Sequence, residues 1–316
     1  MHFLRVLSTQ PTCARERCAL AALVLAGSKN DNPHNNTNKQ YHWNTLPDQQ
    51  KIGIRNYIQS ATQSVAATPQ SLAANKAFAK KLNETLVLIV KREWPARWPT
   101  FMQDLVESCK RSSSECENNV RILKLLSEEV FENYAGNMTS ARAQTLQETF
   151  AKELGSVFSM FLDILTTPQE LELLRATLET LSSFLTWLPA AYITMDTKLI
   201  TVLGTRYLAE PVFRNVVIRC LVEIAAIDGL GEAQEASLRA AMRTLLACVV
   251  QTLQAFFPVN SDLSQLFRRA QYENDQNFVR DLALFFSTFF RHHIARVECA
   301  EMAPACKLSH QYLLLL

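Results

Sequence analysis

Histidine and cysteine side chains gather near the C-terminal end of this 316-residue chain, where they could in principle bind zinc. They are His292, His293, Cys299, Cys306 and His310. Imidazole and thiolate are the ligands that zinc prefers in proteins. Adjacent histidines seldom bind the same ion, however, and the spacing of this group matches no closed zinc pattern. We therefore expect scattered polar side chains here and predict no metal site.

The residue patterns of catalysis and nucleotide binding are also missing from the sequence. It has no Gly-x-Ser-x-Gly elbow, no cysteine in a recognisable catalytic signature and no distinctive pair of carboxylates. The closest glycines, Gly229 and Gly231, lack the third glycine or the lysine of a phosphate-binding loop. The sequence therefore predicts a protein that is not an enzyme and needs no cofactor.

Charge and cysteine usage indicate a reducing compartment and a protein partner. The net charge is +2, and no run of basic residues exceeds a doublet, so no surface for direct nucleic-acid binding is expected. The eight cysteines include no Cys-x-x-Cys pair, and several lie in apolar helical stretches, as reduced thiols usually do.

The first forty residues differ from the rest of the chain. Residues 19–27 form an apolar stretch of nine residues, which is far too short to cross a bilayer, so no membrane insertion is expected. Residues 28–40 contain five asparagines and no large apolar residue, which is typical of a linker. We predict that residues 1–40 are a poorly ordered extension.

From residue 41 onward, apolar residues recur every three or four positions, which predicts helices with one buried face. The clearest stripe is Leu171, Leu174, Leu178, Leu181, Leu185 and Leu188. Thr68-Pro69, Leu46-Pro47 and Thr167-Pro168 with Glu170 are helix-start signals. The predicted helices are 47–66, 69–93, 99–110, 116–132, 140–166, 168–188, 196–208, 211–227, 232–257 and 274–297.

Ten helices in succession favour an α-solenoid of about five helix hairpins. Helix pairs that start near residues 99, 140, 196 and 232 recur at intervals bracketing the roughly 40–47 residues of a HEAT repeat. One such pair cannot bury its apolar face alone and stacks on the next pair. A single helical bundle is the alternative, and it would need inserts or long crossovers to place ten helices around one core.

The most distinctive stretch of the sequence is KREWPARWPTF, residues 91–101. Pro95 is expected to end one helix and Pro99 to start the next, with Trp94 and Trp98 on either side of the turn. This pattern predicts a tight helix hairpin in which the two indoles and two prolines are structural.

Together with other segments, this stretch resembles the exportins of the chromosome region maintenance type, nuclear export receptors of the importin-beta (karyopherin) superfamily. The further segments that agree in order are YHWNTLP (41–47), ILKLLSEEVF (122–131), ATLETL (176–181) with WLP (187–189), PVFRN (211–215) with CLVEIA (220–225), and DQNF (275–278) with LALF (282–285). The resemblance covers about residues 41–297.

The resemblance implies a non-catalytic receptor built from armadillo-like HEAT repeats. Such receptors bind the GTP form of the GTPase Ran and cargo with leucine-rich nuclear export signals, contact nucleoporins and shuttle between nucleus and cytoplasm. This chain is expected to match only an N-terminal array over residues 41–297, with residues 298–316 beginning a further repeat that is cut short. The family's cargo groove and acidic Ran-binding loop would then lie outside it.

The resemblance also suggests where Ran could bind. The second helix of each pair lines the concave face in this superfamily, and Arg121, Lys124, Glu128 and Glu129 fall on such a helix. An ordinary solvated face is the alternative, with ion pairs such as Lys124 with Glu128, or Arg121 with neighbours of Lys124. A HEAT scaffold of a multi-subunit assembly, without a Ran-dependent switch, remains the alternative function.

Overall fold

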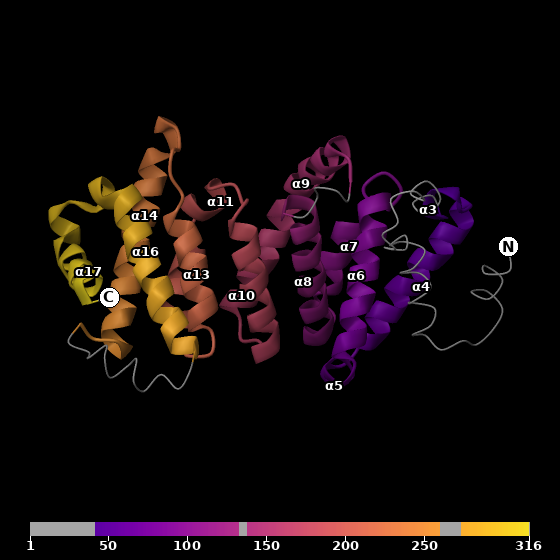
Figure 1. Cartoon of the computed structure of the whole chain (residues 1–316), viewed down its shortest axis with the longest axis horizontal. Coiled ribbons are helices and arrows are strands. Elements are labelled where there is room, and N and C mark those ends of the chain that lie inside the picture. Colours follow the sequence, from indigo (N-terminus) through magenta and orange to yellow (C-terminus); the bar gives the residue numbers. More distant parts are fainter. Residues whose placement is uncertain (1–41, 133–137, 260–272, 316) are drawn as a thin grey trace, which may run out of the picture. The chain divides into compact units, whose positions relative to one another are not determined.

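The computed structural model describes residues 42–132, 138–259 and 273–315, and the elements in these ranges are helical, with no strand among them (Figure 1). The chain divides into two compact units, Met1–Val157 and Phe158–Leu316. Their boundary lies within helix α9, Ser140–Thr166. The predicted all-α class is thus confirmed, while the predicted extension over residues 1–40 lies outside the described residues.

The first unit is organised around α6, which contacts both α4 and α8. Helix α8 also contacts α7, and the short α5 contacts α4, α6 and α8. The elements of this unit before α9 are α3 His42–Thr45, α4 Asp48–Ala66, α5 Pro69–Ala74, α6 Lys76–Glu93, α7 Phe101–Ser108, α8 Ser113–Ser127 and the π-helical turn η1 Glu128–Glu132.

Two series of contacts run through the second unit, so its helices form two layers. In one layer α10 contacts α13, which contacts α16; in the other, α11, α12 and η2 contact α14, which contacts α17. These elements are α10 Leu171–Leu185, α11 Ala191–Thr194, α12 Lys198–Thr201, the π-helical turn η2 Val202–Tyr207, α13 Arg214–Ala225, α14 Glu232–Phe256, α16 Glu273–Val297, the 3₁₀ turn η3 Ala300–Met302 and α17 Ala303–Leu315.

The apolar stripes seen in the sequence form the core of each unit. In α16 the rings of Phe285, Phe286 and Phe289 are fully buried. Tyr312 of α17 stacks on Phe286 at 5.9 Å between ring centroids and donates a hydrogen bond to the carbonyl oxygen of Phe257. Aromatic packing therefore joins α16 and α17.

Two helix-start predictions have different outcomes. The side chain of Thr68 accepts a hydrogen bond from the backbone N–H of Ser71 at 3.2 Å, which confirms the predicted cap of α5. The predicted start at Thr167-Pro168 is wrong, because α10 begins at Leu171 with no side-chain cap. The Thr167 hydroxyl instead donates to the carbonyl oxygen of Asp163 at 2.7 Å, so it caps the end of α9.

Several predicted helices also need internal corrections. The segment 69–93 is interrupted at Asn75, whose side-chain amide donates to the carbonyl oxygen of Ser71 at 3.0 Å. The segment 116–132 begins earlier, at Ser113, and changes to the π-helical turn η1 at its end. The segment 196–208 likewise consists of the short α12 followed by η2.

Gly204 of η2 packs closely against Cys248 of α14. A Cβ atom at this position would lie 2.9 Å from the Cβ of Cys248, which is closer than carbon atoms can pack. Since the Cβ of Cys248 is fixed to the helix backbone, the clash cannot be relieved by rotating a side chain. We therefore expect Gly204→Ala to lower the free energy of unfolding of the second unit by about 1–3 kcal/mol, measured by urea unfolding with circular dichroism.

Gly53 in α4 supplies the matched control. A Cβ atom there would meet no atom within 4 Å, and alanine is about 0.5–1 kcal/mol more favourable than glycine inside a helix. Gly53→Ala should therefore stabilise the chain slightly. Equal stabilisation by both substitutions would show that η2 does not press against α14.

Candidate functional site

Two of the four residues predicted to contact Ran lie on α8, and each forms an ion pair with a carboxylate four positions away along the chain. The Arg121 guanidinium lies 2.9 Å from Oε1 of Glu117, and Lys124 Nζ lies 3.9 Å from Oε1 of Glu128. The pair between Lys124 and Glu128 confirms that expectation, and Arg121 pairs with Glu117, four positions before it on α8. About a third of each predicted side chain stays exposed, 30% for Arg121 and 33% for Lys124.

The other two residues, Glu128 and Glu129, lie on the π-helical turn η1. The Glu129 carboxylate reaches back to α6 and forms an ion pair with the buried Lys91, whose Nζ lies 2.5 Å away. Such π-helical turns are rare and often occur at functional sites. The structure thus brings all four predicted residues onto one continuous segment, α8 and η1, and ties that segment to α6.

The turn between α6 and α7 places both predicted tryptophans in the core. Trp94 and Trp98 are 1% and 6% exposed. Trp94 packs edge-on against Phe150 of α9 at 6.1 Å between ring centroids, and Trp98 packs against Phe101 at 4.9 Å. One expectation fails, because α7 begins at Phe101, so Pro99 is not its first residue. Both indoles contribute to packing.

A group of charged side chains that the sequence did not single out surrounds the end of α6. The Glu93 carboxylate is 5% exposed and accepts hydrogen bonds from Nε1 of Trp43 at 2.9 Å and from Arg97 at 3.4 Å. Arg142 of α9 donates to the backbone carbonyl oxygens of Lys91 and Trp94. Burial lowers the pKa of Arg142, and the charge of Glu93 opposes this shift.

This arrangement suits the end of a helix. The carbonyl groups at the end of α6 carry partial negative charge and lack hydrogen-bond partners within the helix. A guanidinium that donates to two of them supplies the missing hydrogen bonds and a positive charge that stabilises the helix end. Lys91 and Glu93 fall inside the motif 91–101 and could have been found there. Arg142 could not be found from the sequence motif, because it lies about 50 residues from Lys91 and Trp94 along the chain.

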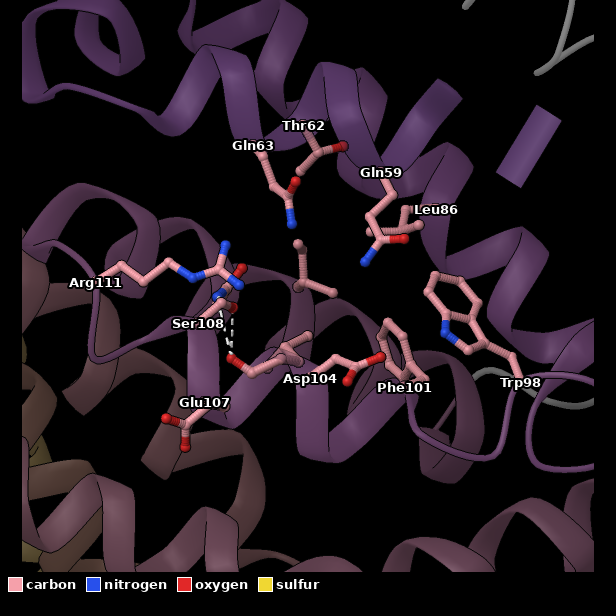
Figure 2. Close-up of a pocket in the computed structure, with 13 residues that line it drawn as sticks. Gln59, Thr62, Gln63, Leu86, Trp98, Phe101, Asp104, Glu107, Ser108 and Arg111 are labelled. Atoms are coloured by element: carbon pink, nitrogen blue, oxygen red, sulfur yellow. Dashed lines mark hydrogen bonds between the residues drawn. The ribbon is translucent and has the colours of Figure 1, made fainter. Parts of the chain in front are cut away.

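A hollow of about 190 Å³ opens between α4, α6, α7 and α8 (Figure 2). Its lining combines apolar and polar side chains: Leu86, Trp98, Phe101, Leu105 and Ile122 with Gln59, Thr62, Gln63, Asp104, Glu107, Ser108, Arg111 and Asn119. Figure 2 shows the side chains of Gln59 and Gln63 on the α4 side and those of Asp104 and Arg111 on the opposite side. The side chains that line the hollow do not converge on one point in a way that would support catalysis.

The histidines and cysteines near the C-terminal end have separate partners. His292 Nδ1 lies 3.1 Å from a carboxylate oxygen of Asp228, and Nε2 of the buried His293 lies 3.0 Å from the carbonyl oxygen of Ala225. Cys299 precedes η3 while Cys306 lies in α17, so the two thiols do not lie on one helix. Among the described residues, no three His, Cys, Asp or Glu side chains are grouped to hold a metal ion.

His293 makes the stability of the second unit depend on pH. Burial lowers the pKa of His293 to about 4, helped by the charge of Arg296 and by His292, while the Ala225 carbonyl and Asp228 oppose the shift. Because protonation then favours the unfolded chain, the stability is complete above pH 6.5 and is lost as the pH falls toward 4. We expect a loss of about 1–2 kcal/mol between pH 7 and pH 5, after allowing for screening by solvent.

Urea unfolding at the two pH values tests this expectation. His293→Gln should remove the pH dependence in this range, whereas the control His310→Gln, at an exposed position of α17, should keep it. Asp228 cannot account for such a loss, since its lowered pKa of about 2 costs stability only in stronger acid. An unchanged slope in His293→Gln would contradict the assignment.

No helix of the described residues is long and apolar enough to cross a membrane.

Residues 75–221 match the family described as "Exportin 1-like protein". The chain is 35% identical to Exportin-1 of Schizosaccharomyces pombe over 86% of its own length, 36% identical to EXPORTIN 1A of Arabidopsis thaliana over 82%, and 34% identical to Exportin-1 of Drosophila melanogaster over 87%. It spans about a quarter of the length of these curated relatives, between 23% and 25%.

Proposed function

Because the chain belongs to the exportin-1-like family, we propose that it acts as part of a nuclear export receptor that binds Ran in its GTP form. The observation that carries the proposal is the identity of 34–36% to three exportin-1 proteins over more than four fifths of the chain. In this role the chain binds partners and catalyses no reaction.

We also propose that its helices form a HEAT-type solenoid. Contacts within each unit support this proposal, because one long-range hydrogen bond in each unit joins residues about one repeat apart. Asn83 bonds Asn118 at a separation of 35 residues, and Tyr207 bonds the carbonyl oxygen of Leu165 at a separation of 42. A HEAT repeat has roughly 40–47 residues. The two-layer order of the second unit is also that of stacked helix pairs.

The proposed Ran-contact surface consists of Arg121, Lys124, Glu128 and Glu129. Support comes from their common location on α8 and η1 and from their partial exposure, between 29% and 33% of each side chain. The pair between Lys124 and Glu128, 3.9 Å apart with both side chains about a third exposed, is weak in water, so these two side chains can exchange partners when a charged protein docks. Cargo proteins with export signals, nucleoporins and shuttling between nucleus and cytoplasm belong to the proposed role of the complete receptor.

Binding of the purified chain to Ran loaded with GTP, and in parallel with GDP, tests the proposal. Moderate salt screens loose charge pairing. We expect selective binding of the GTP form, weakened about tenfold or more by Lys124→Glu, because a reversed charge in an interface costs at least about 1.4 kcal/mol. Lys152→Glu, at an exposed position of α9, is the matched control.

Two outcomes would contradict parts of the proposal. Equal or absent binding to both nucleotide forms, by protein that circular dichroism shows to be helical, would favour a HEAT scaffold without a Ran-dependent switch. Selective binding that Lys124→Glu and Lys152→Glu weaken equally would retain the receptor role and reject α8 as the contact surface.

A further inference from the structure

The outward face of α16 combines basic and apolar side chains, whereas its inward face carries the buried phenylalanines. Arg280, Leu284, Ser287, Arg291 and Ile294 recur at intervals of four and three residues, so they form one stripe along the helix. The Arg280 side chain is 71% exposed, Leu284 is 51% and Ile294 is 39% exposed, and Arg291 is exposed as well. These five residues are called the α16 stripe below.

Helix α13 lies beside α16 and adds a third arginine to this surface (Figure 1). The Arg214 guanidinium lies 5.4 Å from the ring centroid of Phe278 near the start of α16, and Nε2 of His293 near its end lies 3.0 Å from the carbonyl oxygen of Ala225. The two helices therefore run in the same direction, and Arg219, midway along α13, is level with the middle of the α16 stripe. Since α13 packs against α10, α16 and η2, the exposed Arg219 faces outward together with the stripe.

The positive charge of this surface is only partly offset within the second unit. Neither Arg219 nor Arg291 forms an ion pair with a carboxylate of the described residues. Arg280 pairs with Asp281 at 3.0 Å, but this carboxylate is 9% exposed while the guanidinium is 71% exposed. The nearby Glu223 is partly buried, and burial raises the pKa of its carboxyl group. The surface therefore presents arginine charge to solvent around an exposed leucine.

We propose that the α16 stripe and Arg219 bind an acidic amphipathic helix of a partner protein. An exposed leucine between arginines favours a partner with apolar and acidic residues on the same face, because apolar burial and charge pairing then occur together. Arg280 and Arg291 are eleven residues apart, which is about 16 Å along a helix. A partner helix with two carboxylates about three turns apart, and apolar side chains between them, matches this spacing.

The platform for such a partner is fixed before binding. The inward phenylalanines hold α16 in the core, and Arg296 at its end pairs with Asp228 at 3.1 Å and with Glu235 at 2.9 Å. A preformed surface needs little ordering when a partner docks. The exposed Glu298, just past α16, sets the end of the surface, because its carboxylate repels an acidic partner. The proposal does not depend on Ran binding, since the proposed Ran-contact surface belongs to the first unit.

Fluorescence anisotropy with a designed helical peptide tests the proposal on the whole chain. The labelled probe has about five turns, with two glutamates three turns apart and two leucines between them on one face. Its control peptide has glutamine in place of both glutamates. At about 0.15 M salt, where exposed charges more than about 8 Å apart are screened, the glutamate peptide should bind at least about tenfold more tightly than the glutamine peptide.

Matched variants of the chain locate the binding surface. Arg291→Glu should weaken binding of the glutamate peptide about tenfold or more, because it places like charges opposite each other. Lys307→Glu, at an exposed position of α17, changes the net charge equally and should leave binding within about twofold. Leu284→Ala should weaken binding of both peptides about three- to tenfold, since less apolar surface is then covered.

Three outcomes would overturn the proposal. The first is absent binding, or equal binding of the glutamate and glutamine peptides. The second is equal weakening by Arg291→Glu and Lys307→Glu, which would show that the peptide responds only to the net charge of the chain. The third is retention of the chain by vesicles of phosphatidylcholine and phosphatidylserine without binding of the glutamate peptide, which would identify an anionic lipid surface as the occupant.

Discussion

Glu93→Ala is expected to lower the free energy of unfolding of the first unit by about 3–5 kcal/mol, the usual loss when one member of a buried charged group is removed. The Glu93 side chain is 5% exposed and accepts hydrogen bonds from Trp43 and Arg97. Without the carboxylate, the buried indole N–H of Trp43 has no acceptor there. Arg142 also loses the negative charge that opposes its desolvation.

Tryptophan fluorescence during urea unfolding measures this loss, because Trp43, Trp94 and Trp98 belong to the first unit and only Trp187 to the second. Glu93→Gln keeps an oxygen acceptor for Trp43 and should lose less than the alanine variant. Glu84→Ala is the control on the same helix, with a partly exposed carboxylate that pairs with Lys81, and should change stability by no more than about 0.5 kcal/mol. A similar loss from Glu84→Ala and Glu93→Ala would show that the buried network contributes nothing specific.

Helix positions could be predicted well from the sequence because one apolar face determines each of them. The predicted segment 140–166 coincides with α9, and 47–66, 232–257 and 274–297 differ from α4, α14 and α16 by one residue at one end. Periodicity detects a helix by its burial against neighbours, and burial continues to the last turn in these cases. The resemblance carried by residues 91–101 and the other motifs likewise identified the family.

Helix breaks, π-helical turns and caps depend on contacts that the apolar periodicity of the sequence does not reveal. Asn75 separates α5 from α6 without a proline or glycine. The turns η1 and η2 add one residue to the hydrogen-bonded ring without breaking the apolar stripe. Arg142 reaches the end of α6 from a different helix. Thr167 has the composition of a helix cap, but its hydroxyl bonds backward to Asp163.

The candidate site could be predicted in part, because motif and helix assignment together placed Arg121, Lys124, Glu128 and Glu129 on one segment. The sequence also predicted that Lys124 pairs with Glu128, which local spacing determines. It did not predict the pair of Glu129 with Lys91, because that contact joins residues 38 positions apart. Local charge pairs can be predicted from spacing, whereas pairs between helices require the packing of the helices.

Asn83→Ala is expected to lower the free energy of unfolding of the first unit by about 2–3 kcal/mol. Asn83 of α6 and Asn118 of α8 are each 2% exposed. Each side-chain amide donates to the other, at 2.8 and 3.2 Å between nitrogen and oxygen. Removing one amide leaves the other buried without this partner, and an unsatisfied buried polar group costs about 1–3 kcal/mol, to which the lost packing adds.

A double-mutant cycle separates this pairing from simple packing. Replacing both partners by apolar groups of similar shape can be nearly neutral, so Asn83→Leu combined with Asn118→Leu should recover most of the stability that either leucine substitution alone removes. We expect a coupling energy of about 1–3 kcal/mol from urea unfolding. Asn56→Leu, at an exposed position of α4, is the control. Simple addition of the two single losses would contradict the reciprocal amide pair.

The same cycle tests how the proposed Ran surface is held. Because α8 packs on α6 through this buried pair, either single substitution should weaken Ran binding by loosening α8, although neither asparagine is exposed to a partner. The double leucine variant should recover binding together with stability. If the double leucine variant recovers stability but still binds Ran weakly, the amide pair itself determines the position of α8. Apolar packing alone would then not place Arg121 and Lys124 correctly for Ran.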